Sequence, residues 1–350
     1  MNRIVISKLG PPEVLKVIEQ EKLVPDEGEV IIRVHNAGIN FADLMMRLGI
    51  YGQTPELPFT PGYEVSGVIS STGKGVIEFN EGQRVAAFTG VGGYSEEVKV
   101  SVNQVFSIDD SISFETAAAM PVTYITAYHM LVELGNIREG DTVLIHHAAG
   151  GVGTAAVQIA NAHGAGKIFG VASSSKKEFV ENLGMRFIDR TNEDFVKVVK
   201  DETSGAGVHH VLDPVGGPHL KKSFKALRSG GKLYAFGGSS FVKGLKVFKP
   251  TALLRLIRTP RFSPLSMIGK NKAIFGVHMG TIKDFELMRR EIEILSSLLN
   301  KNKIKPIVDK VFHYQDVAKA HHYIHERKNR GKVLLDFSPK VTDEKLVIKK

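Results

Sequence analysis

Residues 1–122 contain short runs in which hydrophobic and polar side chains alternate, separated by glycine-containing turns. The runs at 29–34, 64–69 and 94–100 are typical of half-buried β-strands. Helix signals are few here, and one short helix is predicted over 41–48 with Asn40 as its N-cap. This part of the chain is therefore predicted to be mostly β.

The pattern changes after residue 122, where short apolar strands begin to alternate with helices. Helices are predicted to begin at Val152 and at Lys176. The predicted strands lie at 142–147, 167–171, 208–212, 232–236 and 273–277. Such alternation is typical of a parallel sheet wound with helices on both faces, so an α/β domain is expected here.

The residues after 280 predict two further helices and a strand. Apolar residues spaced three and four apart predict one buried helical stripe. Its members are Phe285, Met288, Ile292, Leu295 and Leu299. A helix is predicted over 316–327 and a strand over 332–337. A length of 350 residues fits about two domains.

The composition narrows the class of protein. The chain has no cysteine, which excludes disulfides, thiolate nucleophiles and cysteine-ligated zinc. The net charge of +9 fits an anionic cofactor, an anionic membrane surface or nucleic acid, but no nucleic-acid-binding motif is present. The start of the chain lacks the apolar run of a signal peptide, and no apolar stretch is long enough for a membrane span. A cytoplasmic protein that binds no nucleic acid is predicted.

The clearest chemical signal is the glycine-rich turn that follows the predicted strand at 142–147. In the frame G-x-G-x-x-G the positions read Ala148, Gly150 and Gly153, with a helix starting at Val152. Glycines let the backbone approach a pyrophosphate, and the helix N-terminus attracts its negative charge. The alternative is a glycine-rich strand–helix turn that binds nothing.

The end of the next strand indicates which dinucleotide is bound. Enzymes that use NAD usually place a carboxylate there for the ribose 2′-hydroxyl. This chain reads Ser-Ser-Ser-Lys-Lys over 173–177, and Arg190 follows the third strand. Hydroxyls and cations suit a 2′-phosphate, which favours NADP(H) over NAD(H). The alternative is that Ser174 or Ser175 caps the next helix and the two lysines are solvated.

These features lie within a set of longer motifs that extends over nearly the whole chain. The motifs are AGINFAD at 37–43, PGYEVSG at 61–67, YITAY at 124–128, AAGGVG at 148–153, DPVGG at 213–217 and GKVLL at 331–335. With them the chain resembles the zinc-independent quinone oxidoreductases of the medium-chain dehydrogenase/reductase superfamily. Within that group it is most similar to the VAT-1 (synaptic vesicle membrane protein) homologues.

The resemblance implies an α/β fold class in which a Rossmann domain, here 123–281, is inserted into a GroES-like, mostly β catalytic domain. The catalytic domain would comprise 1–122 and 282–350, the latter including a tail. NADP(H) would bind in the cleft between the two domains. The resemblance also implies a homodimer formed through Rossmann edge strands, here 273–277.

The resemblance further implies that no metal takes part. Zinc-dependent members of the superfamily carry Cys, His and Cys where this chain has Asn40, Tyr63 and Val122, none of which is a usual zinc ligand. Alcohol oxidation is thereby disfavoured. Reduction of a small hydrophobic quinone or α,β-unsaturated carbonyl needs only a hydride and a proton.

Site residues follow from the resemblance position by position. Catalytic positions at the nicotinamide end would be Asn40, Asp43, Tyr51 and Tyr63. Cofactor-binding positions would be Asn40, Thr126, Gly150, Gly151, Val152, Ser174, Lys177 (or Lys176 if the register differs by one), Arg190, Phe236, Gly237, Gly238, Phe275, His278 and Asn329. Tyr51 or Tyr63 would donate a hydrogen bond to the substrate oxygen, although Tyr63 is equally well explained as a packed tyrosine. His278 is either a site residue or a buried core histidine.

Two further patterns allow more than one interpretation. His321, His322 and His325 lie on one predicted helix, where a solvated face is favoured over a metal site. The basic and apolar segment 241–272 fits a lid for a lipophilic substrate, a surface for anionic lipid, or a helix that packs on the subunit. An alternative function follows from the second interpretation: a nucleotide-binding, VAT-1-like protein that associates weakly with anionic membranes and has little reductase activity.

Overall fold

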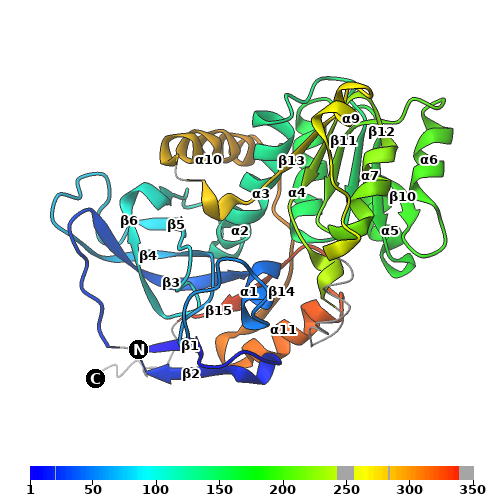
Figure 1. Cartoon of the computed structure of the whole chain (residues 1–350). Coiled ribbons are helices and arrows are strands. Elements are labelled where there is room, and N and C mark those ends of the chain that lie inside the picture. The colour runs from blue at the N-terminus through cyan, green and yellow to red at the C-terminus, as the bar shows by residue number, and fades with distance from the viewer. Residues whose placement is uncertain (20, 243–255, 283, 339–350) are drawn as a thin grey trace, which may run out of the picture.

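The computed structural model describes the whole chain except residues 20, 243–255, 283 and 339–350. Two lobes lie side by side, each built on one sheet (Figure 1). One lobe holds a six-stranded sheet and the other a seven-stranded sheet. The functional question is how the two sheets meet, because the strand ends that carry the predicted motifs face the junction.

The six-stranded sheet is entirely parallel, with the strand order β10-β9-β8-β11-β12-β13. Its strands are β8 (Val143–His146), β9 (Ile168–Ala172), β10 (Arg186–Asp189), β11 (Val208–Asp213), β12 (Leu227–Ala235) and β13 (Ala273–Gly276). Its helices are α4 (Gly151–Ala162), α5 (Lys177–Asn182), α6 (Phe195–Glu202), α7 (Leu220–Ala226) and α9 (Pro264–Ile268). The predicted strands are confirmed, except that β12 begins five residues earlier than expected. β13 lies at one edge of the sheet.

The seven-stranded sheet combines strands from both ends of the chain, in the order β14-β15-β3-β4-β5-β7 with β6 paired to β3. Its strands are β3 (Glu29–Ile39), β4 (Glu64–Thr72), β5 (Arg84–Phe88), β6 (Glu97–Ser101), β7 (Val105–Ser107), β14 (Val308–His313) and β15 (Lys332–Asp336). A separate hairpin consists of β1 (Asn2–Ile6) and β2 (Leu15–Glu19). Leu335 of β15 pairs with Ala37 of β3, so the chain returns to its first sheet after completing the parallel one.

Helices α1, α2, α3, α10 and α11 surround this junction. Their bounds are α1 (Phe41–Arg47), α2 (Phe114–Ala118), α3 (Pro121–Tyr128), α10 (Phe285–Asn300) and α11 (Val317–His325). The apolar stripe predicted on α10 is buried at Met288, Ile292 and Leu295, and the helix packs against α3. Phe285, at the first turn of α10, is 39% exposed and lines the central cavity instead.

The prediction of a solvated histidine face on α11 is wrong. His321 is fully buried, with its ring 6.1 Å from the Tyr94 ring. His325 is half-buried, contacts the buried Arg47 guanidinium and lines the central cavity, whereas His322 pairs with Glu13 near the surface at 2.6 Å. The reason is that α11 packs on β15 and on the short turn Pro12–Val14 after β1, so the face that carries His321 and His325 points inward.

The basic segment 241–272 is described only in part, since 243–255 lies outside the described residues. In the remainder, Phe262 packs against Phe224 with a ring separation of 5.0 Å. Four large apolar side chains are exposed around α9: Leu256, Ile257, Leu265 and Ile268. Among the described helices, none is long and apolar enough to cross a membrane.

Candidate active site

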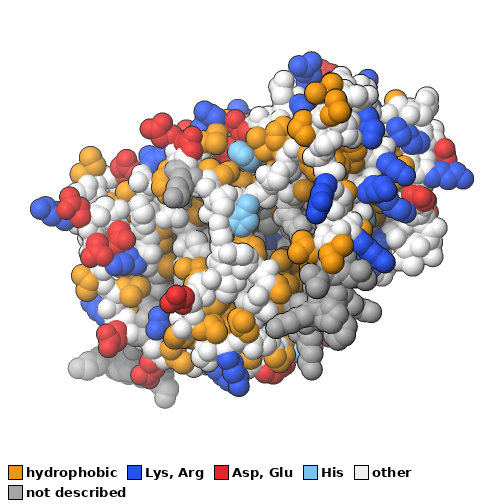
Figure 2. Space-filling model, viewed as in Figure 1, with side chains coloured by type: hydrophobic (Ala, Val, Ile, Leu, Met, Phe, Trp, Pro, Cys, Tyr) orange, Lys and Arg blue, Asp and Glu red, His pale blue; other side chains and the backbone are white. Residues whose placement is uncertain are grey.

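A cavity of about 1410 Å³ lies between the two lobes and is lined from both of them. Figure 2 shows the surface hollowed there, with histidine side chains near the opening. It also shows Lys and Arg gathered mainly over the lobe with the parallel sheet. Pockets of this size at a junction between domains are the usual location of a small-molecule site.

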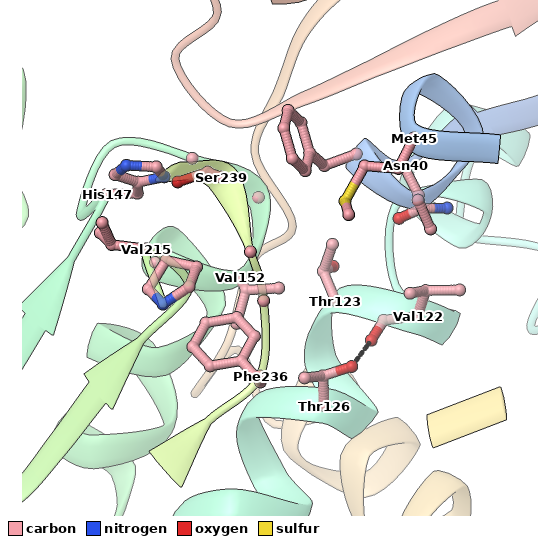
Figure 3. A pocket seen from close by; sticks show the side chains of 18 of the residues that line it. Asn40, Met45, Val122, Thr123, Thr126, His147, Val152, Val215, Phe236 and Ser239 are labelled. Atoms are coloured by element: carbon pink, nitrogen blue, oxygen red, sulfur yellow. Dashed lines mark hydrogen bonds between the residues drawn. The ribbon is translucent and has the colours of Figure 1, made fainter. Parts of the chain in front are cut away.

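The glycine-rich turn forms one wall of this cavity. β8 ends at His146, the turn runs through Ala149, and α4 begins at Gly151 with its N-terminus toward the cavity. A Cβ at Gly153 would lie 2.5 Å from the His147 carbonyl oxygen, so only glycine fits there. Gly150, Gly151 and Val152 all line the cavity, as predicted. Figure 3 shows the Val152 side chain there. The free N–H groups of this helix end can hold an anionic diphosphate.

A cluster of cations lies at the end of the cavity beyond the glycine turn. Lys176, Arg190 and Arg327 line this end. Burial lowers the pKa of Lys176 to about 8; Asp309 opposes that effect, and Arg190, Arg330 and Arg327 add to it. Glu193 also lines the cavity near Arg190, but its carboxylate accepts the Asp189 amide at 2.7 Å and lies 3.7 Å from the Arg186 guanidinium. The three cations therefore suit a phosphate dianion.

The structure corrects the register of this predicted phosphate site. The Lys177 ammonium points to solvent and lies 3.9 Å from the Glu181 carboxylate, and Lys177 does not line the cavity. Ser174 does not line it either, because the 3₁₀ turn Ser174–Lys176 directs its hydroxyl to Asp189. Ser173 and Lys176 take those places.

Arg327 was missed by sequence reasoning. It follows α11, far along the chain from the glycine turn, and reaches the cavity because the segment before β15 bridges the glycine turn at Gly150. The available signal was its place in a basic run, Arg327 to Arg330, directly before the predicted last strand.

The segment 327–332 crosses the cavity from the cation cluster to the opposite lobe. The Lys176 ammonium donates to the Asn329 carbonyl oxygen, and the Gly331 amide donates to the Ala149 carbonyl oxygen at 2.9 Å. Gly331 also forms a β-bridge with Gly150. Asn329, predicted as a cofactor-binding position, lines the cavity. The segment therefore attaches the glycine turn to the seven-stranded sheet.

A buried polar network lies where this segment ends. The Lys332 ammonium donates to the Glu64 carboxylate and to the Asn40 amide oxygen, the latter at 2.7 Å. The Asn40 amide nitrogen donates to Glu64 at 2.8 Å, and Glu64 also accepts the Val122 amide at 2.7 Å. Asn40 and Lys332 line the cavity, whereas Glu64 is fully buried. Asn40 thus has a fixed orientation at the cavity wall.

Asp43 does not lie on the cavity, contrary to its expected catalytic position. Its carboxylate is fully buried and accepts the Asn40 amide at 2.7 Å, the Gly62 amide at 3.0 Å and the Tyr94 hydroxyl at 3.1 Å. Burial raises its pKa to about 6, although those hydrogen bonds act in the opposite direction. Asp43 caps α1 and orients the loop at Gly62, so its role is structural.

Aromatic and apolar side chains line the other end of the cavity, among them Tyr51 and Tyr63 as predicted. The Tyr51 hydroxyl lies 2.5 Å from His278 Nε2, and the Tyr63 hydroxyl lies 3.8 Å from the sulfur of Met46. Burial raises the pKa of both tyrosines, so both are protonated at neutral pH. The other members of this lining are Phe41, Met45, Phe236, Val277, Met279, Ile282 and Phe285.

The remaining predicted positions divide between cavity and core. Thr126, Phe236, Gly237, Gly238 and His278 line the cavity. Figure 3 shows Thr126 and Phe236 around Val152, with the Thr126 hydroxyl bonded to the Val122 carbonyl oxygen at 2.6 Å.

Phe275 does not line the cavity. It is the register partner of Tyr234 on the neighbouring strand β12 and stacks on that ring with a separation of 5.7 Å. Val277 and His278, just beyond the end of β13, line the cavity instead.

A second group that sequence reasoning missed surrounds Asp213, at the end of β11. Its carboxylate accepts the Val215 and Gly216 amides at 2.7 and 3.0 Å, the His219 ring at 2.8 Å and the Ser223 hydroxyl at 2.6 Å. Burial alone would raise the pKa of Asp213, but these partners lower it below its usual value. The network fixes the turn that carries Val215 to the cavity wall (Figure 3).

Comparison with known proteins agrees with this two-lobed site. Residues 26–110 match the alcohol dehydrogenase GroES-like domain, and residues 151–294 match the zinc-binding dehydrogenase family. The chain is 40% identical over 317 residues to a synaptic vesicle membrane protein VAT-1 homolog of Rattus norvegicus, covering 89% of this chain and 77% of that protein. It is 30% identical over 343 residues to the quinone oxidoreductase of Rattus norvegicus, covering 96% and 97%.

Solved structures show the same fold. The human VAT-1 homolog-like protein superposes with a TM-score of 0.84 at 33% identity, covering 96% of this chain and 98% of that one. The Escherichia coli quinone oxidoreductase complexed with NADPH gives 0.85 at 29% identity, covering 96% and 100%. The GroES-like and Rossmann architecture expected from the sequence is confirmed. The chain belongs to the medium-chain dehydrogenase/reductase superfamily of oxidoreductases, as a VAT-1-like relative of the quinone oxidoreductases.

Proposed function

We propose that this protein is an NADPH-dependent reductase that transfers a hydride to a quinone or an α,β-unsaturated carbonyl. The observation that carries the proposal is the division of one cavity into two chemically different ends. One end combines the glycine turn with Lys176, Arg190 and Arg327. The other end is apolar and aromatic. An anionic dinucleotide and a hydrophobic acceptor fit these two ends.

The protein's own groups would perform three tasks. NADPH, when bound, supplies the hydride. The glycine turn and the cations hold its phosphates, and the apolar lining around Phe236 and Met45 excludes water from the reacting atoms. The hydroxyl of Tyr51 or Tyr63 donates a proton to the substrate oxygen as charge develops there.

The relatives support this choice of cofactor and substrate class. The Escherichia coli protein described above is a quinone oxidoreductase complexed with NADPH, and CurK enoyl reductase shares the fold at 29% identity with a TM-score of 0.80. The first reduces a quinone and the second an enoyl group, by their names. Both acceptors have an electron-poor carbon conjugated to a carbonyl.

The proposal is tested by mixing the protein with NADPH and a panel of quinones and α,β-unsaturated ketones and following the loss of NADPH absorbance. Turnover of at least one acceptor, with NADH much less effective, is expected. If no acceptor in the panel is reduced, the reductase proposal is wrong, even if NADPH binds.

A second candidate function is association with anionic lipid, favoured by the surface around α9. Leu256, Ile257, Leu265 and Ile268 are exposed there, next to Arg258, Arg261 and Lys270. Apolar side chains flanked by cations suit the interface of an acidic membrane. Co-sedimentation with phosphatidylserine vesicles at low salt tests this. A Leu265→Glu/Ile268→Glu variant is expected to abolish binding, and no sedimentation of the unaltered protein would exclude it.

Two further expectations stay predictions. The homodimer through the β13 edge is one of them. The cytoplasmic location expected from the sequence also stays a prediction.

A further inference from the structure

Tyr51 and His278 form the one direct hydrogen bond described between side chains of the two lobes at the apolar end of the cavity. Tyr51 follows α1, in the lobe with the seven-stranded sheet, whereas His278 follows β13 of the parallel sheet. The Tyr51 hydroxyl oxygen lies 2.5 Å from His278 Nε2, and the rings are 5.3 Å apart. Both side chains line the cavity.

The other ring nitrogen of His278 indicates where the proton lies. Nδ1 is buried and has no hydrogen-bond partner among the described residues. A buried N–H without an acceptor is rarer and more costly than a buried lone pair without a donor. The neutral ring therefore carries its proton on Nε2, and this N–H donates to the Tyr51 oxygen.

This direction leaves the Tyr51 proton free. A tyrosine that accepts a hydrogen bond from histidine can donate its own proton elsewhere, and the cavity is the open side. Tyr63 is the poorer donor, because burial and its hydrogen bond with the Tyr51 hydroxyl both raise its pKa, and its hydroxyl lies 3.8 Å from the Met46 sulfur. Its ring lies edge-on to Tyr51, with the centroids 6.4 Å apart.

We propose that Tyr51 is the proton donor to the substrate oxygen and that His278 is the positioning residue that aims its hydroxyl into the cavity. The inference rests on the proposed reductase function. Bound NADPH would supply the hydride for a new C–H bond at the electron-poor carbon, so that the C=C or quinone π electrons move to the carbonyl oxygen. That oxygen takes the Tyr51 proton. The phenolate left behind keeps the hydrogen bond from His278 Nε2–H and regains a proton from water before the next turnover.

The first test reads the tautomer without any catalysis. Long-range ¹H–¹⁵N spectra of the free protein at neutral pH report which nitrogen of each histidine carries a proton. The His278 signals are identified by their loss in His278→Gln. A protonated Nε2 with an unprotonated Nδ1 is expected. A proton on Nδ1 alone would mean that Tyr51 donates to the ring, which overturns the proposal.

The second test measures kcat and KM with one acceptor that the unaltered protein reduces. Tyr51→Phe is expected to lower kcat about 100-fold, and His278→Leu about 10-fold, while NADPH affinity stays within about twofold in both. His278→Gln places an amide N–H near the Nε2 position and is expected to restore kcat to within about threefold. In the double variant Tyr51→Phe/His278→Leu, kcat should equal that of Tyr51→Phe alone, since His278 acts through Tyr51.

A matched control is His163→Leu, a histidine away from the cavity whose ring bonds the Ile159 carbonyl oxygen in its own helix. It should leave kcat unchanged. If the unaltered protein is active and His278→Leu is equally active, the proposed role of His278 is wrong, while the reductase proposal stands. Inactivity of the unaltered protein toward every acceptor overturns the reductase proposal, and the catalytic role of Tyr51 with it.

Discussion

Lys176 and Lys177 are neighbours in the sequence, yet only Lys176 lines the cavity. The Lys176 ammonium is half-buried among Arg190 and Arg327, whereas that of Lys177 is exposed beside Glu181. A charge-assisted hydrogen bond to phosphate contributes roughly 1.5–3 kcal/mol, or about 10- to 100-fold in affinity. Lys176→Ala should therefore weaken NADPH binding about 10- to 100-fold and leave NADH binding nearly unchanged. Titration followed by nicotinamide fluorescence measures both.

Lys177→Ala is the matched control, expected to keep NADPH affinity within about twofold because its charge is solvated. An equal loss in both variants would show that the two lysines are not distinguished as the structure indicates.

The pKa of Lys176 also predicts a pH dependence. A lysine is charged below its pKa, so with a pKa of about 8 the ammonium is present at pH 7 and largely lost by pH 9. A ribose phosphate is a dianion throughout that interval, having a second pKa of about 6. NADPH affinity should fall severalfold from pH 7 to 9, while NADH affinity stays flat. In Lys176→Arg the dependence should disappear, because a guanidinium stays charged; a persisting slope would implicate another group.

Lys332 and Glu64 form a buried pair, 3% and 0% exposed at the side chain, which connects the starts of β15 and β4. Removing one member of such a pair leaves an uncompensated buried charge and costs about 3–5 kcal/mol. Lys332→Met should lower the free energy of unfolding by that amount in urea denaturation. Lys332→Met/Glu64→Gln should recover much of the loss.

The matched control is Lys328→Met, since Lys328 pairs with Glu326 at the surface. It should leave the urea midpoint almost unchanged. If Lys332→Met and Lys328→Met change the urea midpoint by the same amount, the buried network is not what stabilises this junction.

At the scale of elements, the sequence predicted well those features that depend on one-sided burial. Three features appear as expected: the apolar stripe on α10, the cap at Asn40 and the strand–turn–helix around Gly150. Each is marked in the sequence by a regular spacing of apolar residues or by a short local motif. The strands of the parallel sheet were recognisable as short apolar runs between helices.

The wrong predictions concern which side of a turn or helix faces the interior, and not whether that turn or helix exists. The turn Ser174–Lys176 directs Ser174 toward Asp189 and Lys176 toward the cavity, and a rotation of one residue would exchange the roles of Lys176 and Lys177. The buried face of α11 could not be predicted from its histidines, because histidine occurs both in protein interiors and at surfaces. His321 is fully buried in this structure. Such rotations are set by tertiary contacts.

At the scale of the whole molecule, β13 is an edge strand of the parallel sheet, paired among the described strands only with β12. If two copies join there, a charge on that edge should separate them. Gly276 is exposed, and a Cβ there would meet nothing within 4 Å, so Gly276→Lys alters the edge without disturbing the subunit. Light scattering is expected to give a dimer for the unaltered protein and a monomer for the variant.

Ile77→Lys provides the control for the dimer, because Ile77 is 91% exposed on the other lobe. It should remain a dimer. A monomeric unaltered protein at micromolar concentration would contradict the edge-strand association.

The pairing of the last strand with β3 has no signature in the hydrophobic pattern, since the partners Leu335 and Ala37 lie 298 positions apart in the sequence. Only the family motifs indicated it. For the same reason Arg327 and Lys332 escaped a reading based on local patterns, although both line the cavity.

The segment 327–332 has a consequence for biosynthesis. A ribosome finishes every strand of the parallel sheet before it makes Arg327, Asn329 and Lys332, so the nascent nucleotide domain carries a glycine turn whose far wall does not yet exist. The phosphate end gains its third cation, and Asn40 and Glu64 gain their ammonium partner, in one late event. The cavity can therefore be complete only after the last residues of this segment have been made.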